Sequence, residues 1–131
     1  MRFVDTSFFV ALQFRRDRHH DEAGVLWSRE RGTLVTSSHV LGEIWTFLRR
    51  RLGHEQACRF LTAARGSTSV VVRAVDEELE ADAWRWLIRH DGRPYSFVDA
   101  TSFATMRRMR IREAFAFDGD FSSAGFTEVR R

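Results

Sequence analysis

The chain has 131 residues, a hydrophobic fraction of 44% and a formal net charge of +3, which fits one domain with a sizeable core. Its single cysteine, Cys58, excludes an internal disulfide, and no apolar run approaches the ~20 residues of a membrane span. We therefore expect a single domain over residues 1–131, in a soluble cytoplasmic protein that has no membrane association. All 21 basic residues are arginine, whose planar guanidinium suits phosphate and carboxylate partners.

Strands and helices are predicted to alternate along the chain. In chain order the pattern predicts a strand at Arg2–Val4, helices at Ser7–Phe14 and His20–Arg31, a strand at Thr33–Thr36, helices at Ser38–Leu52 and Glu55–Arg65, a strand at Val70–Val75, helices at Asp76–His90 and Ser96–Arg110, and strands at Ala114–Phe117 and Thr127–Val129. The longest helix is indicated by apolar residues at every fourth position, from Val40 through Ile44 and Leu48 to Leu52.

This alternation predicts an α/β fold. Strands separated by helices are joined by right-handed crossovers, which gives a central, mainly parallel twisted sheet covered by helices on both faces. Ligand sites in such sheets form beyond the carboxyl ends of the strands. Asp5 and Asp118 occupy that position, because each follows a predicted strand directly.

Acidic residues recur at strand ends and on helices: Asp5, Glu43, Asp99 and the pair Asp118 and Asp120. Two unit charges about 4 Å apart repel by roughly 4 kcal/mol at an effective dielectric constant near 20. If the fold brings several of these carboxylates together, they need protons or cations, and oxygen ligands favour hard ions such as Mg²⁺ or Mn²⁺.

Each acid also has an ordinary structural explanation. Asp5 could cap the first helix, although Thr6 and Ser7 offer the same chemistry, so we expect that the helix does not need Asp5 as its cap. Ser96-x-x-Asp99 has the spacing of a capping box. Asp118-Gly119-Asp120 has the composition of a turn. Glu43 could be an ordinary solvated or paired surface residue, although it has no basic partner three or four residues further along its helix.

The ordered set of acidic motifs resembles a known family. The segments that carry the resemblance are Asp5-Thr6-Ser7, Glu43, Phe97-Val98-Asp99-Ala100 and Phe117-Asp118-x-x-Phe121. They match, in order and over essentially the whole chain, the motifs of PIN-domain ribonucleases, and the chain looks most like the VapC toxins of bacterial toxin–antitoxin pairs. One departure is Ala116, since many members carry Thr or Ser two residues before the fourth acid.

The resemblance implies a PIN-like α/β/α sandwich and a metal-dependent endoribonuclease. By resemblance, Asp5, Glu43, Asp99 and Asp118 are the catalytic acids and hold Mg²⁺ or Mn²⁺, with Asp120 as a further metal contact or the true fourth acid. The implied partners are an RNA substrate, a small VapB-like antitoxin and a second copy of the chain. The aromatic content also suggests a homodimer, with Trp45 to Phe60 contributing to its interface.

Three other functions fit parts of the pattern. A PIN nuclease of RNA maturation would have the same acids and no antitoxin. A non-cleaving RNA-binding module would bind metal weakly and use the arginine clusters 15–18, 49–51 and 107–112 for RNA. A phosphoacceptor domain of the response-regulator type would need a lysine near its acids, and this chain has no lysine.

Overall fold

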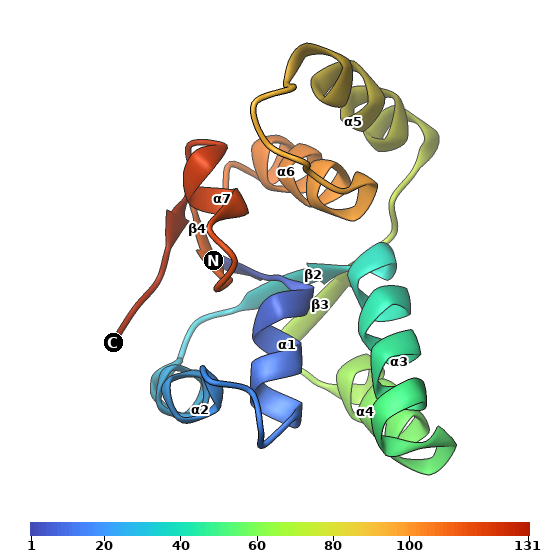
Figure 1. Cartoon of the computed structure of the whole chain (residues 1–131), viewed down its shortest axis with the longest axis vertical. Coiled ribbons are helices and arrows are strands. Elements are labelled where there is room, and N and C mark those ends of the chain that lie inside the picture. Colours follow the sequence, from blue (N-terminus) through green and yellow to red (C-terminus); the bar gives the residue numbers. More distant parts are fainter.

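Five short strands pair in the order β3-β2-β1-β4-β5, and every neighbouring pair is parallel. The computed structural model describes all 131 residues (Figure 1). The strands are β1 (Arg2–Val4), β2 (Leu34–Ser37), β3 (Val70–Arg73), β4 (Glu113–Phe115) and β5 (Thr127–Glu128). The helices are α1 (Thr6–Gln13), α2 (His20–Arg29), α3 (Ser38–Leu52), α4 (His54–Gly66), α5 (Glu77–Arg89), α6 (Phe97–Met109) and α7 (Asp120–Ser123).

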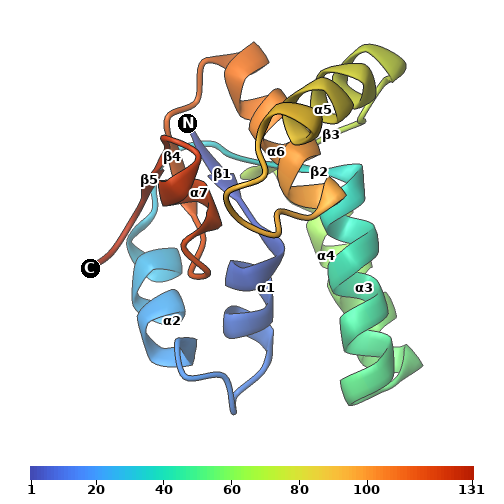
Figure 2. The same ribbon diagram turned by 45° about the horizontal axis from the view of Figure 1, so that its top comes forward.

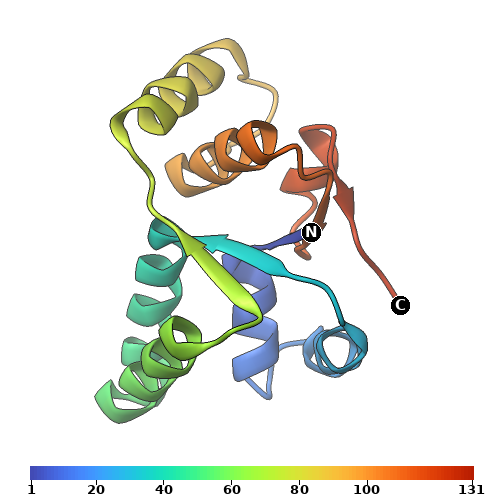
Figure 3. The same cartoon turned by 180° about the vertical axis from the view of Figure 1, so that it is seen from behind.

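The direction of each crossover decides which face of the sheet a helix covers. The chain moves one way across the sheet from β1 to β3, and right-handed crossovers place α1 to α4 on one face. It then returns past β1 to β4, which places α5 and α6 on the other face, as the view from behind shows (Figure 3). The expected three-layer α/β/α architecture is therefore confirmed.

The strand order reverses between β1 and β4. The segment after β1 continues into α1 on one face, while the segment after β4 continues toward α7 beside α6 on the other. A crevice opens at such a switch point, beyond the carboxyl ends of the two strands. The fold therefore places the residues after Val4 and after Phe115 at the rim of one crevice.

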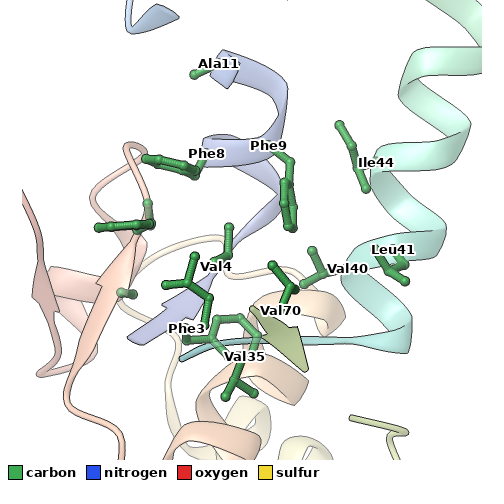
Figure 4. Close-up of a cluster of buried hydrophobic side chains, with 14 of the residues drawn as sticks. Phe3, Val4, Phe8, Phe9, Ala11, Val35, Val40, Leu41, Ile44 and Val70 are labelled. Atoms are coloured by element: carbon green, nitrogen blue, oxygen red, sulfur yellow. The ribbon is translucent and has the colours of Figure 1, made fainter. Parts of the chain in front are cut away.

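The core between the sheet and helices α1 to α4 is built from aromatic and branched side chains. Phe8 is fully buried and stacks on Phe115 of β4, with ring centroids 4.6 Å apart. Val4 and Val70 from the strands lie in the same cluster as Phe9 of α1 and residues of α3 (Figure 4). Burying side chains of this size contributes about 1.5–3 kcal/mol each before the entropy cost of ordering them, so the rim of the crevice is fixed on a rigid base.

Several element boundaries differ from the sequence-based expectation. The strand expected at Ala114–Phe117 is Glu113–Phe115, so two residues separate it from Asp118. The strand expected to reach Val75 ends at Arg73. The turn expected after Asp118 contains a short helix, α7. No helix is both long and apolar enough to cross a membrane.

Candidate active site

Asp5 lies directly after β1 and is almost fully buried. Its carboxylate accepts hydrogen bonds from the backbone N–H of Ser7 at 3.1 Å and from the Ser7 hydroxyl at 2.7 Å. Asp5 is therefore the N-cap of α1, and the expectation that the helix would not need Asp5 as its cap is wrong. The reason is geometric, because only the residue preceding the first turn has extended backbone angles and can turn its side chain back onto the helix.

Asp99 lies in the first turn of α6 and is held by the predicted capping box. The Asp99 backbone N–H donates to the Ser96 hydroxyl at 2.9 Å, and the Ser96 backbone N–H donates to the Asp99 carboxylate at 3.0 Å. The residue is buried, with 8% of its surface exposed. The capping box fixes the carboxylate at the helix N-terminus, where the helix dipole favours negative charge.

Asp118 and Asp120 face the same crevice from the segment after β4. The Asp120 backbone N–H donates to an Asp118 carboxylate oxygen at 3.1 Å. Gly119 between them has a φ of 83°, a left-handed conformation that costs other residues roughly 1–2 kcal/mol. This turn lets both carboxylates approach Asp99.

Arg93, in the segment between α5 and α6, binds the outer acid of the group. Its Nε and one Nη donate to the same Asp120 oxygen at 3.0 and 2.9 Å, and that Nη also reaches the Asp118 carbonyl at 3.4 Å. The hydrogen bond to Asp120 raises the pKa of Arg93. One cation therefore already balances part of the negative charge.

Three of the predicted acids form a compact group of possible metal ligands. One carboxylate oxygen from each of Asp99, Asp118 and Asp120 lies within 4.8 Å of the others. At that spacing two unit charges repel by roughly 3–4 kcal/mol at an effective dielectric constant near 20. Oxygen-only donors of this kind fit a hard divalent ion such as Mg²⁺ or Mn²⁺.

The pKa values of Asp5, Asp99 and Asp118 record the same crowding. Burial, followed by the charge of Asp118 and that of Asp99, raises the pKa of Asp5 to about 8. Burial, followed by the charges of Asp120 and Asp118, raises the pKa of Asp99 to about 6. The pKa of Asp118 is raised as well, chiefly because neighbouring atoms remove water from its carboxyl group. A cation in the crevice would relieve all three.

Of the five predicted acids, Asp5 lies beside the three possible metal ligands without belonging to their group, and Glu43 lies outside the site. It is exposed on α3, without a hydrogen bond or an ion pair, and lines a separate hollow with Thr46, Phe47, Arg50 and Arg51. Its helix still begins beside the site, because His39 in the first turn contacts Phe97, two residues before Asp99. A role for Glu43 in holding metal stays a prediction.

Two residues of the site had no predicted role. Ser7 bridges the two strand ends, because its hydroxyl donates to Asp5 and accepts a hydrogen bond from the Phe117 backbone N–H at 3.1 Å. Arg93 binds Asp120 from a segment 27 residues earlier in the chain. The first could have been suspected from the Asp5-Thr6-Ser7 motif, whereas nothing in the sequence pairs Arg93 with Asp120.

The sequence profile of the PIN domain matches residues 2–127. The chain belongs to the PIN domain family. It is 56% identical over 130 residues to "23S rRNA-specific endonuclease VapC20" of Mycobacterium tuberculosis, a match that covers 99% of this chain and 98% of the relative.

Two solved structures share the fold of this chain. The crystal structure of Mycobacterium tuberculosis VapC20, described as a sarcin–ricin loop cleaving toxin, superposes with a TM-score of 0.95 at 54% identity and covers both chains completely. A chain of a toxin–antitoxin complex from Klebsiella pneumoniae has a TM-score of 0.63 at 13% identity, covering 92% of this chain and 94% of the other, which shows a shared fold. The predicted PIN-like fold is therefore confirmed.

Proposed function

We propose that this PIN domain is a divalent-metal-dependent endoribonuclease that acts as the toxin of a toxin–antitoxin pair. The observation that carries the proposal is the group of Asp99, Asp118 and Asp120 beside buried Asp5, at the switch point of the sheet. The identity to VapC20 over nearly the full chain supports both the nuclease and the toxin role.

In this proposal Asp99, Asp118 and Asp120 supply carboxylate oxygens to the ion, and the nearby carboxylate of Asp5 adds to the negative charge that attracts it. A bound Mg²⁺ or Mn²⁺ would lower the pKa of a water molecule, making a nucleophile near neutral pH, and offset charge that develops on the scissile phosphate. Ser7 holds the Asp5 carboxylate in place through its hydroxyl. Arg93 restrains Asp120 and presents a guanidinium at the rim of the crevice, where it favours an approaching phosphate.

The proposed substrate class is that of the similar protein VapC20. VapC20 is described as specific for 23S rRNA and as cleaving the sarcin–ricin loop. We infer that this chain cuts a structured ribosomal RNA loop of the same kind. Purified protein incubated with an RNA stem-loop carrying that sequence should release two fragments in Mg²⁺ and none in EDTA.

The cleavage assay also separates the nuclease from an RNA-binding module. A module that binds without cutting would retain the stem-loop in a mobility-shift assay and leave it intact at every Mg²⁺ concentration. If cleavage returns when Mg²⁺ or Mn²⁺ is added back after EDTA, the activity depends on the metal. Cleavage that persists in EDTA would remove the metal-dependent mechanism.

The toxin role requires a small antitoxin as partner. We propose a peptide that places an Arg or Lys against the acids in place of metal, since a basic side chain would satisfy the same charges. The product of a small neighbouring gene should co-purify with this chain and inhibit it, and inhibition should weaken as Mg²⁺ rises. A nuclease of RNA maturation would have no such partner, so a tight complex that leaves cleavage untouched would contradict the toxin role.

Asp118 is expected to matter more for cleavage than Asp120. Asp120 is already neutralised in part by Arg93, whereas Asp118 lies between Asp99 and Asp5 in the network of charges. Asp118→Ala should lower kcat by on the order of 10²–10³-fold, and Asp120→Ala by a smaller factor, at saturating Mg²⁺. Arg93→Gln serves as the control, because it removes the ion pair with Asp120 and leaves the Asp120 carboxylate in place. A larger loss from Asp120→Ala would reverse the assignment of the fourth acid.

We also propose that the protein is a homodimer. The structure packs Trp45 against the core and buries Phe60, so much of the aromatic surface predicted for the interface is already covered within one chain. Apolar surface remains on α5, where Trp84 and Ile88, one turn apart, are 53% and 82% exposed. Exposed apolar patches mark interfaces, and sedimentation showing only monomer at micromolar concentration would contradict the dimer.

A further inference from the structure

Six arginines without acidic partners lie at or just beyond the C-terminal ends of α1 and α3. They are Arg15, Arg16, Arg18, Arg49, Arg50 and Arg51, and all six are exposed. None takes part in an ion pair. By contrast, Arg108 near the end of α6 binds Asp76 at 2.9 Å and lies 3.6 Å from Glu78. The third arginine cluster is therefore partly neutralised within the chain, and the first two are not.

The two unpaired clusters meet at one hollow. Arg51 of α3 lines it together with Arg15 and Arg16, which follow α1, and its volume is about 570 Å³. Each helix end favours cations through its own dipole, but that effect does not explain why two cationic ends are packed side by side. Like charges gathered on adjacent helices repel one another, and an external anion removes that repulsion.

The basic hollow adjoins a second hollow on α3, the helix whose first turn lies beside the candidate active site. The second hollow, of about 540 Å³, shares Arg51 and extends past Arg50 and Phe47 to Glu43. Glu43 and Arg50 are two helical turns apart, so they lie on one face about 10 Å from each other along the axis. One turn before Glu43, His39 contacts Phe97 at the start of α6, the helix that carries Asp99.

The surface follows the seam where α1 and α3 run side by side away from the sheet (Figure 2). Phe14 at the end of α1 meets Phe47 of α3 edge to face, with ring centroids 5.8 Å apart. The Arg51 guanidinium lies 5.7 Å from the Phe47 ring, so its head is restrained toward the seam by a cation–π contact. Arg51 is thus anchored on the aromatic pair of Phe14 and Phe47.

We propose that this seam, defined by Arg15, Arg16, Arg50 and Arg51, binds the phosphates of the RNA substrate on one side of the cleavage site. The inference rests on the proposed nuclease function, because the seam would bind the part of the RNA strand that extends beyond the acidic site. Arginine forks match phosphate oxygens, and contacts of this kind position a nucleic acid without reading its sequence. A second copy of this protein would bring the same unpaired arginines to the seam, and the like charges would repel. Charge complementarity therefore favours RNA, a polyanion, as the partner that binds there.

The test compares two double variants of equal charge change. Arg50→Gln with Arg51→Gln removes two seam arginines from the last turn of α3. Arg65→Gln with Arg89→Gln removes two exposed, unpaired arginines from the last turns of α4 and α5, away from the seam. Each pair is made in an Asp99→Asn background, and fluorescence anisotropy follows binding of a labelled sarcin–ricin stem-loop from about 50 to 200 mM salt.

The seam variant should lower the slope of log affinity against log salt by about 1.4, since each lost phosphate contact on a single strand accounts for about 0.7. The control pair should leave the slope unchanged. In the active background, the seam variant should raise KM by roughly tenfold and leave kcat on saturating RNA as in the parent protein.

Two results would overturn the proposal. One is a seam variant whose salt slope equals that of the parent and of the control pair. The other is a seam variant that changes the sedimentation coefficient instead of the slope, which would make the seam an interface between copies. A failure of the proposed nuclease function would give a different result. A parent protein that cuts no RNA in Mg²⁺ would disprove the nuclease function, even if the salt slope of RNA binding depended on the seam arginines.

Discussion

Replacing Asp99 by asparagine is expected to abolish RNA cleavage while leaving the fold intact. The side-chain oxygen of the introduced amide can still accept the hydrogen bond from the Ser96 backbone, so α6 keeps its cap. An amide is, however, a poorer ligand than a carboxylate for a hard cation. We expect a loss of kcat on the order of 10³–10⁴-fold, comparable with removal of one member of a catalytic unit.

Asp76→Asn is the matched control for this variant. Asp76 caps α5, accepts the Leu79 backbone N–H at 2.8 Å and binds Arg108 near the opposite end of α6 from Asp99. It therefore receives the same chemical change at a helix N-terminus without touching the site. Cleavage should be retained by Asp76→Asn, and near-native cleavage by Asp99→Asn in Mg²⁺ would refute the metal-ligand assignment.

The stability of the metal-free protein is expected to fall as pH rises from about 5 to 8, and Asp5 should account for most of that fall. Burial and neighbouring charges raise the pKa of Asp5 from 3.8 in the unfolded chain to about 8 in the folded chain. The folded state thus binds this proton more tightly than the unfolded state. The resulting stabilisation is complete below the unfolded pKa and is lost as pH rises through the folded one, at up to about 1.4 kcal/mol per pH unit.

Thermal melts in EDTA measure this dependence directly. Asp5→Asn should flatten the profile and melt higher than the wild type at pH 8, because it removes a buried charge among like charges. The two proteins differ in no other titratable group, so the difference between the two curves isolates Asp5. Asp76→Asn should keep the wild-type slope, since the pKa of Asp76 is lowered and its contribution is lost only in acid.

Divalent metal should reverse the trend in the wild type. A cation binds the deprotonated carboxylates, so the stabilisation that Mg²⁺ provides should grow toward pH 8. A wild-type melting temperature that does not change with pH in EDTA, or an Asp5→Asn variant as pH-sensitive as the wild type, would contradict the role assigned to the buried carboxyl.

The architecture follows from the amino-acid sequence, because local patterns of residues specify local elements. The four-residue spacing from Val40 to Leu52 predicts α3 with its observed ends, and the β-branched run Val70–Val75 predicts β3, which ends two residues earlier at Arg73. The capping box of Ser96 and Asp99 was also readable, since both partners lie within one helical turn. Once strands and helices alternate, right-handed crossovers leave few possible sheets.

The candidate acids were likewise identifiable from the sequence, but their arrangement depends on packing between remote parts of the chain. Strand order brings Asp5 beside the segment after β4, although more than 100 residues separate them in the chain. The same packing groups Asp99 with Asp118 and Asp120, leaves Glu43 on an exposed helix face, and joins Arg93 to Asp120. Which arginines find acidic partners depends equally on packing, because an ion pair needs two side chains within about 4 Å. Such distances between remote residues leave no local pattern in the sequence, so only the folded chain defines the charge balance of the site and its surface.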